Sequence, residues 1–236
     1  MSNRIEGLFL KSTKYSENAI IVDLLTDFHG KKSFLFKGLK NKKNSFIFQP
    51  FHIISFNCKF NSQKNINLGF SPELSFPVYS IISDIRKTSN ALFLTELLYK
   101  TINKNEPSEK LFFHLKKIIL SFEHHDFNSS FSVFFIKDIL PFIGLQPINN
   151  FSEKNKYFNL QDGNFSSNSD SVNDPLFSGF LFSKLLGMNI DSYNVMKFAK
   201  QDRKAIMSIL LDYLSYHANV NTSDVKSLKI LYSLYD

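Results

Sequence analysis

Residues 29–43 read HGKKSFLFKGLKNKK and contain a short strand between two glycines. The His29-Gly30 turn opens this strand and Gly38 closes it. Successive side chains of a strand point to opposite faces, so Phe34 and Phe36 share one face. We expect the two rings to fill the core of a small barrel, the alternative being that they offer surfaces on which bases stack.

Other segments of the N-terminal part show the same strand signals. Within residues 51–60, apolar side chains recur at every second position from Ile54 to Phe60. The remaining predicted strands cover residues 5–11, 19–26 and 66–70. Five short strands with loops of uneven length match a five-stranded OB-type β-barrel. A three-stranded sheet or another small barrel gives a similar pattern.

After Pro77 the apolar residues follow a helical period. We therefore predict an α+β protein, with an OB-fold nucleic-acid-binding domain in residues 1–80 and a mostly helical domain in residues 81–236. His217 falls on an apolar helical stripe and is expected to be a packed, hydrogen-bonded core histidine. Residues 149–174 form an irregular insert with a small hairpin at Asp162-Gly163. The predicted helices span residues 83–103, 107–124, 129–143, 174–187, 202–218 and 224–235.

Positive charge is concentrated in one window of the chain. Residues 28–72 hold eight lysines and nine phenylalanines but no Asp or Glu, whereas the whole chain carries a net charge of +7. Clustered lysines interleaved with aromatics favour binding of a polyanion with stacking bases, which is a nucleic acid. A lysine-rich composition typical of AT-rich genomes is the plainer explanation, but it does not explain a long window without a carboxylate.

The candidate DNA-binding residues are lysines placed by this pattern in loops or beside turns of the barrel. Lysine ammonium groups act as point charges, so they favour phosphate contacts and a weak sequence preference. The candidates are Lys11, Lys14, Lys31, Lys32, Lys37, Lys40, Lys42, Lys43 and Lys64.

The sequence lacks the signals of most enzyme classes. Glycine-rich phosphate loops, a nucleophile elbow and a zinc-protease motif are all absent from it. Cys58 is the sole cysteine, so we expect neither an intrachain disulfide nor a cysteine zinc cluster. We predict a protein without catalytic residues or cofactor, without a signal peptide or membrane span, and located in the cytoplasm in association with the nucleoid.

Several motifs, in order and spacing, resemble the bacterial RecO family of recombination mediators. Near the N-terminus these are Glu6–Lys11, Tyr15–Asn18, Thr26–Lys31 and Lys37-Gly38, the last followed by a basic stretch. Near the C-terminus, Tyr213–His217 followed by Lys226-Ser227-Leu228 is similar to the last helices of that family.

The resemblance implies an OB domain followed by a helical domain, without catalytic turnover. It implies a protein that binds single- and double-stranded DNA and anneals complementary strands. It also implies that the protein works with RecR to load recombinase onto DNA coated by single-strand-binding protein, whose C-terminal tail is a further partner. The basic pairs Arg86-Lys87, Lys116-Lys117 and Arg203-Lys204 lie beside apolar helices and either receive that acidic tail or are ordinary solvated helix faces.

Two other functions fit parts of the pattern. An OB-fold factor that binds RNA or the ribosome would use the same lysines. A nuclease would need a convergent set of carboxylates or histidines, which the sequence does not suggest.

The resemblance also generates a prediction about metal. Many relatives carry a four-cysteine zinc module inside the helical domain, but the matching residues 149–174 contain no cysteine. Because a structural zinc site needs four Cys or His ligands at defined spacings, we expect the purified protein to contain no stoichiometric zinc. Elemental analysis checks this, and one zinc per chain, with a melting temperature that falls in chelator, would contradict it.

Overall fold

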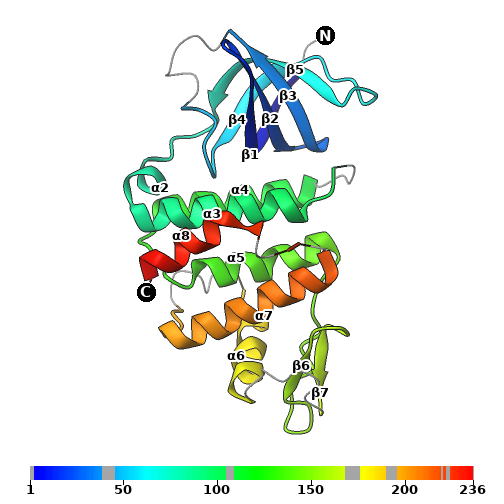
Figure 1. The fold of residues 1–236 in the computed structure, drawn as a ribbon, viewed down its shortest axis with the longest axis vertical. Helices are drawn as coiled ribbons and strands as arrows, with labels where there is room; N and C mark the ends of the chain where they lie inside the picture. The colour runs from blue at the N-terminus through cyan, green and yellow to red at the C-terminus, as the bar shows by residue number, and fades with distance from the viewer. Residues whose placement is uncertain are drawn as a thin grey trace. The chain divides into compact units, whose positions relative to one another are not determined.

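The N-terminal part is a closed five-stranded barrel (Figure 1). In this computed structural model, residues 3–38, 46–104, 109–167, 176–189, 196–218, 220–221 and 224–235 are described. The barrel order is β1-β2-β3-β5-β4, with β3 and β5 parallel and β1 closing on β4. This is the OB fold predicted from the strand pattern. The strands are β1 (Asn3–Ser16), β2 (Ala19–Thr26), β3 (Gly30–Lys37), β4 (Ile53–Cys58) and β5 (Ile66–Leu74).

Aromatic rings fill the inside of the barrel. Phe34 and Phe36 of β3 are at most 1% exposed, and both pack edge-on against Phe56 of β4. The two rings are therefore core residues and offer no stacking surface. Gly69 of β5 lies directly over this core, and a Cβ atom there would fall 2.4 Å from the ring of Phe36. The absence of a side chain at Gly69 is what makes room for Phe36.

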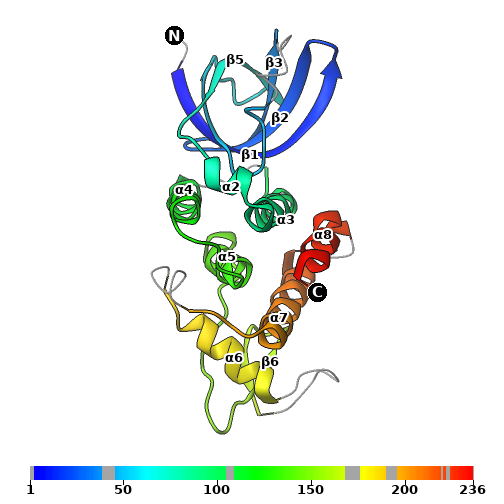
Figure 2. The same cartoon turned by 90° about the vertical axis from the view of Figure 1, so that its left-hand side faces the viewer.

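Helices cover one end of the barrel and form a compact unit with it. This unit comprises residues 1–124 and 227–236. Figure 2 shows α3 and α4 nearly end-on beneath β1. The division predicted from the sequence at residue 80 coincides with the change from strands to helices. That residue 80 is also a domain boundary remains a prediction. The helices are α2 (Tyr79–Ser83), α3 (Ile85–Thr101), α4 (Glu109–His124) and α8 (Lys226–Tyr235).

Charged side chains from distant residues cap several of these helices. Lys87 is 2% exposed, and its ammonium group donates to the carbonyl oxygens of Phe122, at 2.7 Å, and Glu123 at the end of α4. The carboxylate of Glu123 accepts from the backbone N–H groups of Ser80 and Ile81 at the start of α2. Both contacts complement the helix dipole and the unpaired groups at helix ends.

Residues 125–226 form the second compact unit. The predicted hairpin is present, with Gly163 in the left-handed conformation at φ 65°. The half-buried His217 donates a hydrogen bond of 2.7 Å from its imidazole Nε2 to the carbonyl oxygen of Leu160 and packs against Tyr213, so it is packed and hydrogen-bonded as expected. The expected helix start at Asp174-Pro175 lies outside the described residues. The elements are α5 (Phe131–Ile139), the 3-10 helix η1 (Leu140–Ile143), β6 (Tyr157–Asn159), β7 (Asn164–Ser166), α6 (Leu176–Leu186) and α7 (Lys200–Ala218).

The contact between Gly69 and Phe36 predicts a stability effect. We expect Gly69→Ala to lower the free energy of unfolding by about 1–3 kcal/mol, because an added methyl group overpacks the barrel core. Urea denaturation measures this change. Gly187→Ala is the matched control, since a Cβ atom there would meet its nearest neighbours at 3.7 Å, an ordinary contact. Adding Phe36→Leu to Gly69→Ala should recover part of the loss; equal stabilities of parent and Gly69→Ala would refute the packing explanation.

Candidate nucleic-acid interface

A stack of two rings joins the β2–β3 turn to the loop between β4 and β5. The imidazole of His29 lies 3.7 Å from the ring of Phe60, centroid to centroid, with the planes 8° apart. Burial lowers the pKa of His29 and so favours the neutral ring. The stack fixes the start of β3 beside residues 59–65, and both segments carry lysines.

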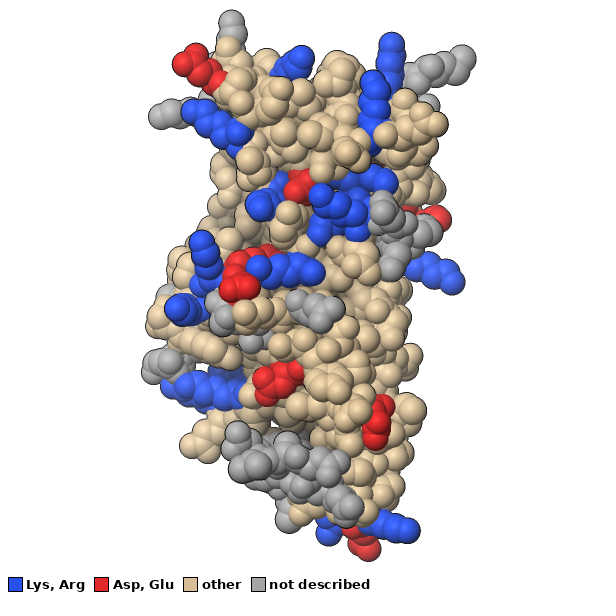
Figure 3. Space-filling model, turned by 45° about the vertical axis from the view of Figure 1, so that its right-hand side comes forward, with Lys and Arg blue, Asp and Glu red and all other residues tan. Residues whose placement is uncertain are grey.

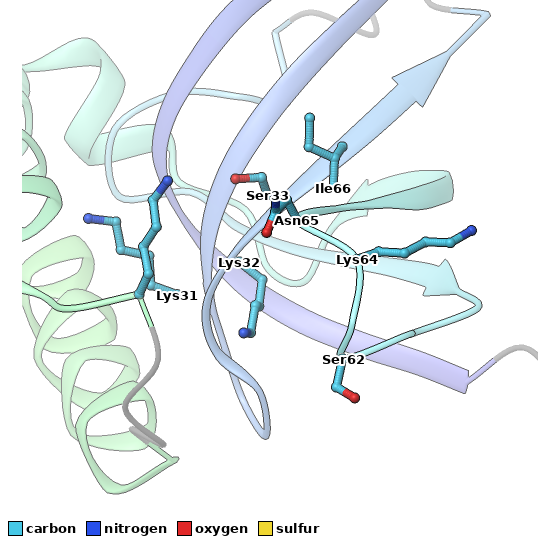
Figure 4. Close-up of a pocket in the computed structure, with 8 residues that line it drawn as sticks. Lys31, Lys32, Ser33, Ser62, Lys64, Asn65 and Ile66 are labelled. Carbon is cyan, nitrogen blue, oxygen red and sulfur yellow. The ribbon is translucent and has the colours of Figure 1, made fainter.

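Between these segments lies a cavity of about 420 Å³. Figure 4 shows Lys32 projecting from β3 and Lys64 from the β4–β5 loop, with Ser33 and Asn65 close to each other where the two segments meet. Its walls are rich in hydrogen-bond donors and contain no carboxylate. The lining residues are Lys31, Lys32, Ser33, Ser62, Lys64, Asn65, Ile66 and Lys104.

The sequence grouped Lys31 with the exposed lysines, and the structure corrects this. Lys31 is only 6% exposed, and its side chain points toward the helices (Figure 4). Its ammonium group donates to the carbonyl oxygen of Ile102, at 3.0 Å, and to that of Tyr99, and lies 4.2 Å from the centre of the Tyr99 ring. The charge of Lys31 therefore holds the C-terminal end of α3 against β3 and is already engaged.

Burial has an electrostatic consequence for Lys31. The pKa of its ammonium group falls from 10.5 to about 8, mainly because burial removes its hydration; Asp23 opposes this shift, and the charges of Lys104 and Lys11 add to it. Lys104 and Lys11 thus lie close enough to Lys31 to repel its charge. Positive potential is concentrated where β3 meets the end of α3.

The other candidate lysines lie on the barrel surface. Lys11 and Lys14 project from β1, Lys37 ends β3, and all three are exposed. Register places Lys14 and Lys37 toward the β1–β2 turn, whereas Lys11 lies opposite Asp23, nearer the cavity. Figure 3 shows several Lys and Arg side chains over the barrel part of the displayed face, and others elsewhere on that face. Lys40, Lys42 and Lys43 lie outside the described residues.

Sequence reasoning missed Lys104. This lysine follows α3, outside the acid-free window, and reaches the cavity because Lys31 fixes the preceding Ile102 to β3. Only the tertiary contact brings it beside Lys32 and Lys64. No local sequence pattern indicates that these three lysines lie near one another.

Sequence reasoning also missed an apolar strip on the outer face of β5. Ile66, Leu68 and Phe70 are 43–47% exposed, because Asn67 and Gly69 take the inward positions of this strand. Ile66 borders the cavity, and the other two side chains continue away from it. A lysine-lined cavity next to an exposed apolar strip can hold a charged backbone and the flat apolar groups attached to it.

Signals of other chemistries are missing from the described part of the chain. There, no three His, Cys, Asp or Glu side chains gather as a metal site would require. None of the described helices is long and apolar enough to cross a membrane.

The fold and this surface define the chain as an OB-barrel protein with a helical second part. A family model described as "Recombination protein O N terminal" matches residues 1–68, and "Recombination protein O C terminal" matches residues 82–223. The chain belongs to the RecO family of DNA repair proteins.

Individual relatives agree over the full length. The chain is 27% identical over 242 residues to the DNA repair protein RecO of Azobacteroides pseudotrichonymphae and 24% identical over 240 residues to that of Flavobacterium psychrophilum, covering 100% of each pair of chains. It is 35% identical over 111 residues to the RecO protein of Bacillus pumilus, which is 45% of this chain and 42% of the relative.

The lowered pKa of Lys31 predicts a pH dependence of stability. The folded protein releases the Lys31 proton at about pH 8, whereas the unfolded chain keeps it up to its ordinary value of 10.5. The unfolded state binds more protons over this interval, so the contribution of Lys31 to the free energy of unfolding rises from pH 8 to pH 10.5. We expect the parent to show this rise relative to Lys31→Met in urea denaturation.

Lys110→Met is the control, because it removes an exposed lysine of α4. It should keep the pH profile of the parent. A Lys31→Met variant whose stability follows the parent at every pH would show that Lys31 is not the titrating group.

Proposed function

We propose that this protein is a DNA-binding recombination mediator. It binds single- and double-stranded DNA and anneals complementary strands. Together with RecR, it helps to load recombinase onto DNA coated by single-strand-binding protein. The observation that supports this proposal is the set of exposed lysines on an OB barrel, in a chain that belongs to the RecO family.

Binding through this surface is electrostatic. The barrel places exposed lysines on β1, β3 and the β4–β5 loop, so a strand that follows the barrel meets positive charge repeatedly. Annealing two strands requires only that their phosphate repulsion is reduced and their bases stay accessible. This task needs no catalytic group, and we propose that the protein has no turnover.

The contact to the tail of single-strand-binding protein belongs to the same proposal, but the basic pairs noted in the sequence offer less free charge than expected. Lys87 is buried against the end of α4. Lys116 pairs with Glu6 at 2.5 Å, and Arg86 with Asp84 at 2.6 Å. Lys117 of α4 keeps an exposed position.

The acid-free window predicts how DNA affinity responds to charge reversal. Replacing Lys40, Lys42 and Lys43 together with Glu should weaken binding to all DNA sequences alike, because lysines contact phosphates and not base edges. For single strands, the affinity of the parent should fall by about 0.7 log units per log unit of salt for each phosphate neutralised. Fluorescence anisotropy at several salt concentrations measures both effects.

The control exchanges the exposed Lys110, Lys154 and Lys229 for Glu, an equal change of net charge outside the candidate site. Annealing of complementary strands without nucleotide or metal is measured in parallel, on bare DNA and on DNA coated by single-strand-binding protein with or without its C-terminal tail. A folded Lys40/Lys42/Lys43 variant that binds like the parent would remove the basic window from the site. A parent that binds RNA but anneals no DNA would favour an RNA-binding factor.

A further inference from the structure

The cavity between β3, the β4–β5 loop and the end of α3 has the chemistry of an anion site. Three of its lysines, Lys32, Lys64 and Lys104, have no hydrogen-bond or ion-pair partner among the described residues, and Lys31 beside them is occupied by the end of α3. The carboxylate of Asp23 is not among the lining residues and accepts a hydrogen bond from the hydroxyl of Ser33. Three ammonium groups at one cavity without an acid in its walls repel one another, so an anion between them is stabilised.

The uncharged residues in the cavity wall indicate which class of anion fits, because they offer hydrogen-bond donors in addition to the lysine charges. Ser62 and Asn65 add a hydroxyl and an amide to the same walls, whereas the hydroxyl of Ser33 already donates to Asp23. A phosphate group has several acceptor oxygens and uses such a ring of donors well. Lysine stems carry rotatable bonds, so ammonium groups on opposite walls can turn toward one phosphate.

The surroundings of the cavity indicate where this phosphate comes from. Ile66 lies in its wall, and Leu68 and Phe70 extend the exposed apolar strip along β5. A free phosphate ion has no apolar group that could pack on this strip. A nucleotide strand, in contrast, places a flat base next to each phosphate, and the base can pack there. On these observations, and resting on the proposed DNA-binding function, we propose that the cavity seats one phosphate of a nucleic-acid strand, held jointly by Lys32, Lys64 and Lys104.

Lys104 is the residue that makes this a composite site. The barrel supplies Lys32 from β3 and Lys64 from the loop, but Lys104 follows α3. Its place depends on the bond from Lys31 to the carbonyl of Ile102, two residues earlier. A helix of the first unit thus contributes a contact to the nucleic-acid surface of the barrel.

The salt dependence of binding tests the joint seat. If three lysines hold one phosphate, Lys32→Gln, Lys64→Gln and Lys104→Gln combined should lower the slope of log affinity against log salt by about 0.7 for single-stranded DNA. Three lysines on three separate phosphates would lower it by about 2. The measurement uses the full chain and oligonucleotides with a 5′-hydroxyl or a 5′-phosphate. A slope change with both oligonucleotides supports an internal phosphate, and a change with the 5′-phosphate alone supports a seat for a strand end.

Two controls keep the outcomes separate. Lys110→Gln, Lys154→Gln and Lys229→Gln combined remove the same charge from other exposed positions and should leave the slope close to that of the parent. Thermal melting shows whether each variant is folded. A slope change near zero or near 2 in a folded variant overturns the joint seat, although the parent still binds DNA. The joint seat is also overturned if the folded variant loses binding of an acidic peptide but keeps its binding of DNA. A parent that binds no DNA overturns both proposals.

Discussion

The arrangement of the first unit depends on the hydrogen bonds that the buried ammonium group of Lys31 donates to the end of α3. Burying this charge is unfavourable, as its lowered pKa of about 8 shows. Two carbonyl oxygens at the negative end of α3 and the face of Tyr99 offset that cost. The result is a fixed relation between β3 and the end of α3, and this relation forms the cavity. A structural lysine thereby sets the position of the lysines around it.

The same principle recurs in the helices of this unit. The ammonium group of Lys87 donates to a carbonyl oxygen at the end of α4. The carboxylate of Glu123 accepts from a backbone N–H group at the start of α2, and the carboxylate of Glu96 accepts from the N–H group of Ser227 near the start of α8. Each helix end is satisfied by a charge from a residue far along the chain, and not only by local caps such as Asp84 at the start of α3. Such contacts form only when the elements are packed together, so the helix ends and the packing stabilise one another.

This dependence explains what could be predicted from the sequence. The barrel followed from a local signal, the two-residue alternation that placed Phe34 and Phe36 in the core, and His217 followed from a helical stripe. Lys31 and Lys32 are neighbours of one type, and alternation separates their faces, but only the packing of α3 decides which of them is buried. Lys87 was read as part of a surface pair for the same reason. Lys104 reaches the cavity through a contact between distant residues, which composition and periodicity do not record.

The first unit is discontinuous, since the chain leaves it at residue 124 and returns at residue 227. This has a consequence for the protein during its synthesis. The hydrogen bond from Ser227 to Glu96 joins residues 131 positions apart. At a synthesis rate of about 5–20 residues per second, Ser227 is added to the chain roughly 7–26 s after Glu96. The barrel strands, which end at Leu74, can pair long before that time. On the ribosome the barrel can therefore form early, while the helical layer beneath it lacks α8 until residues 226–235 have been made.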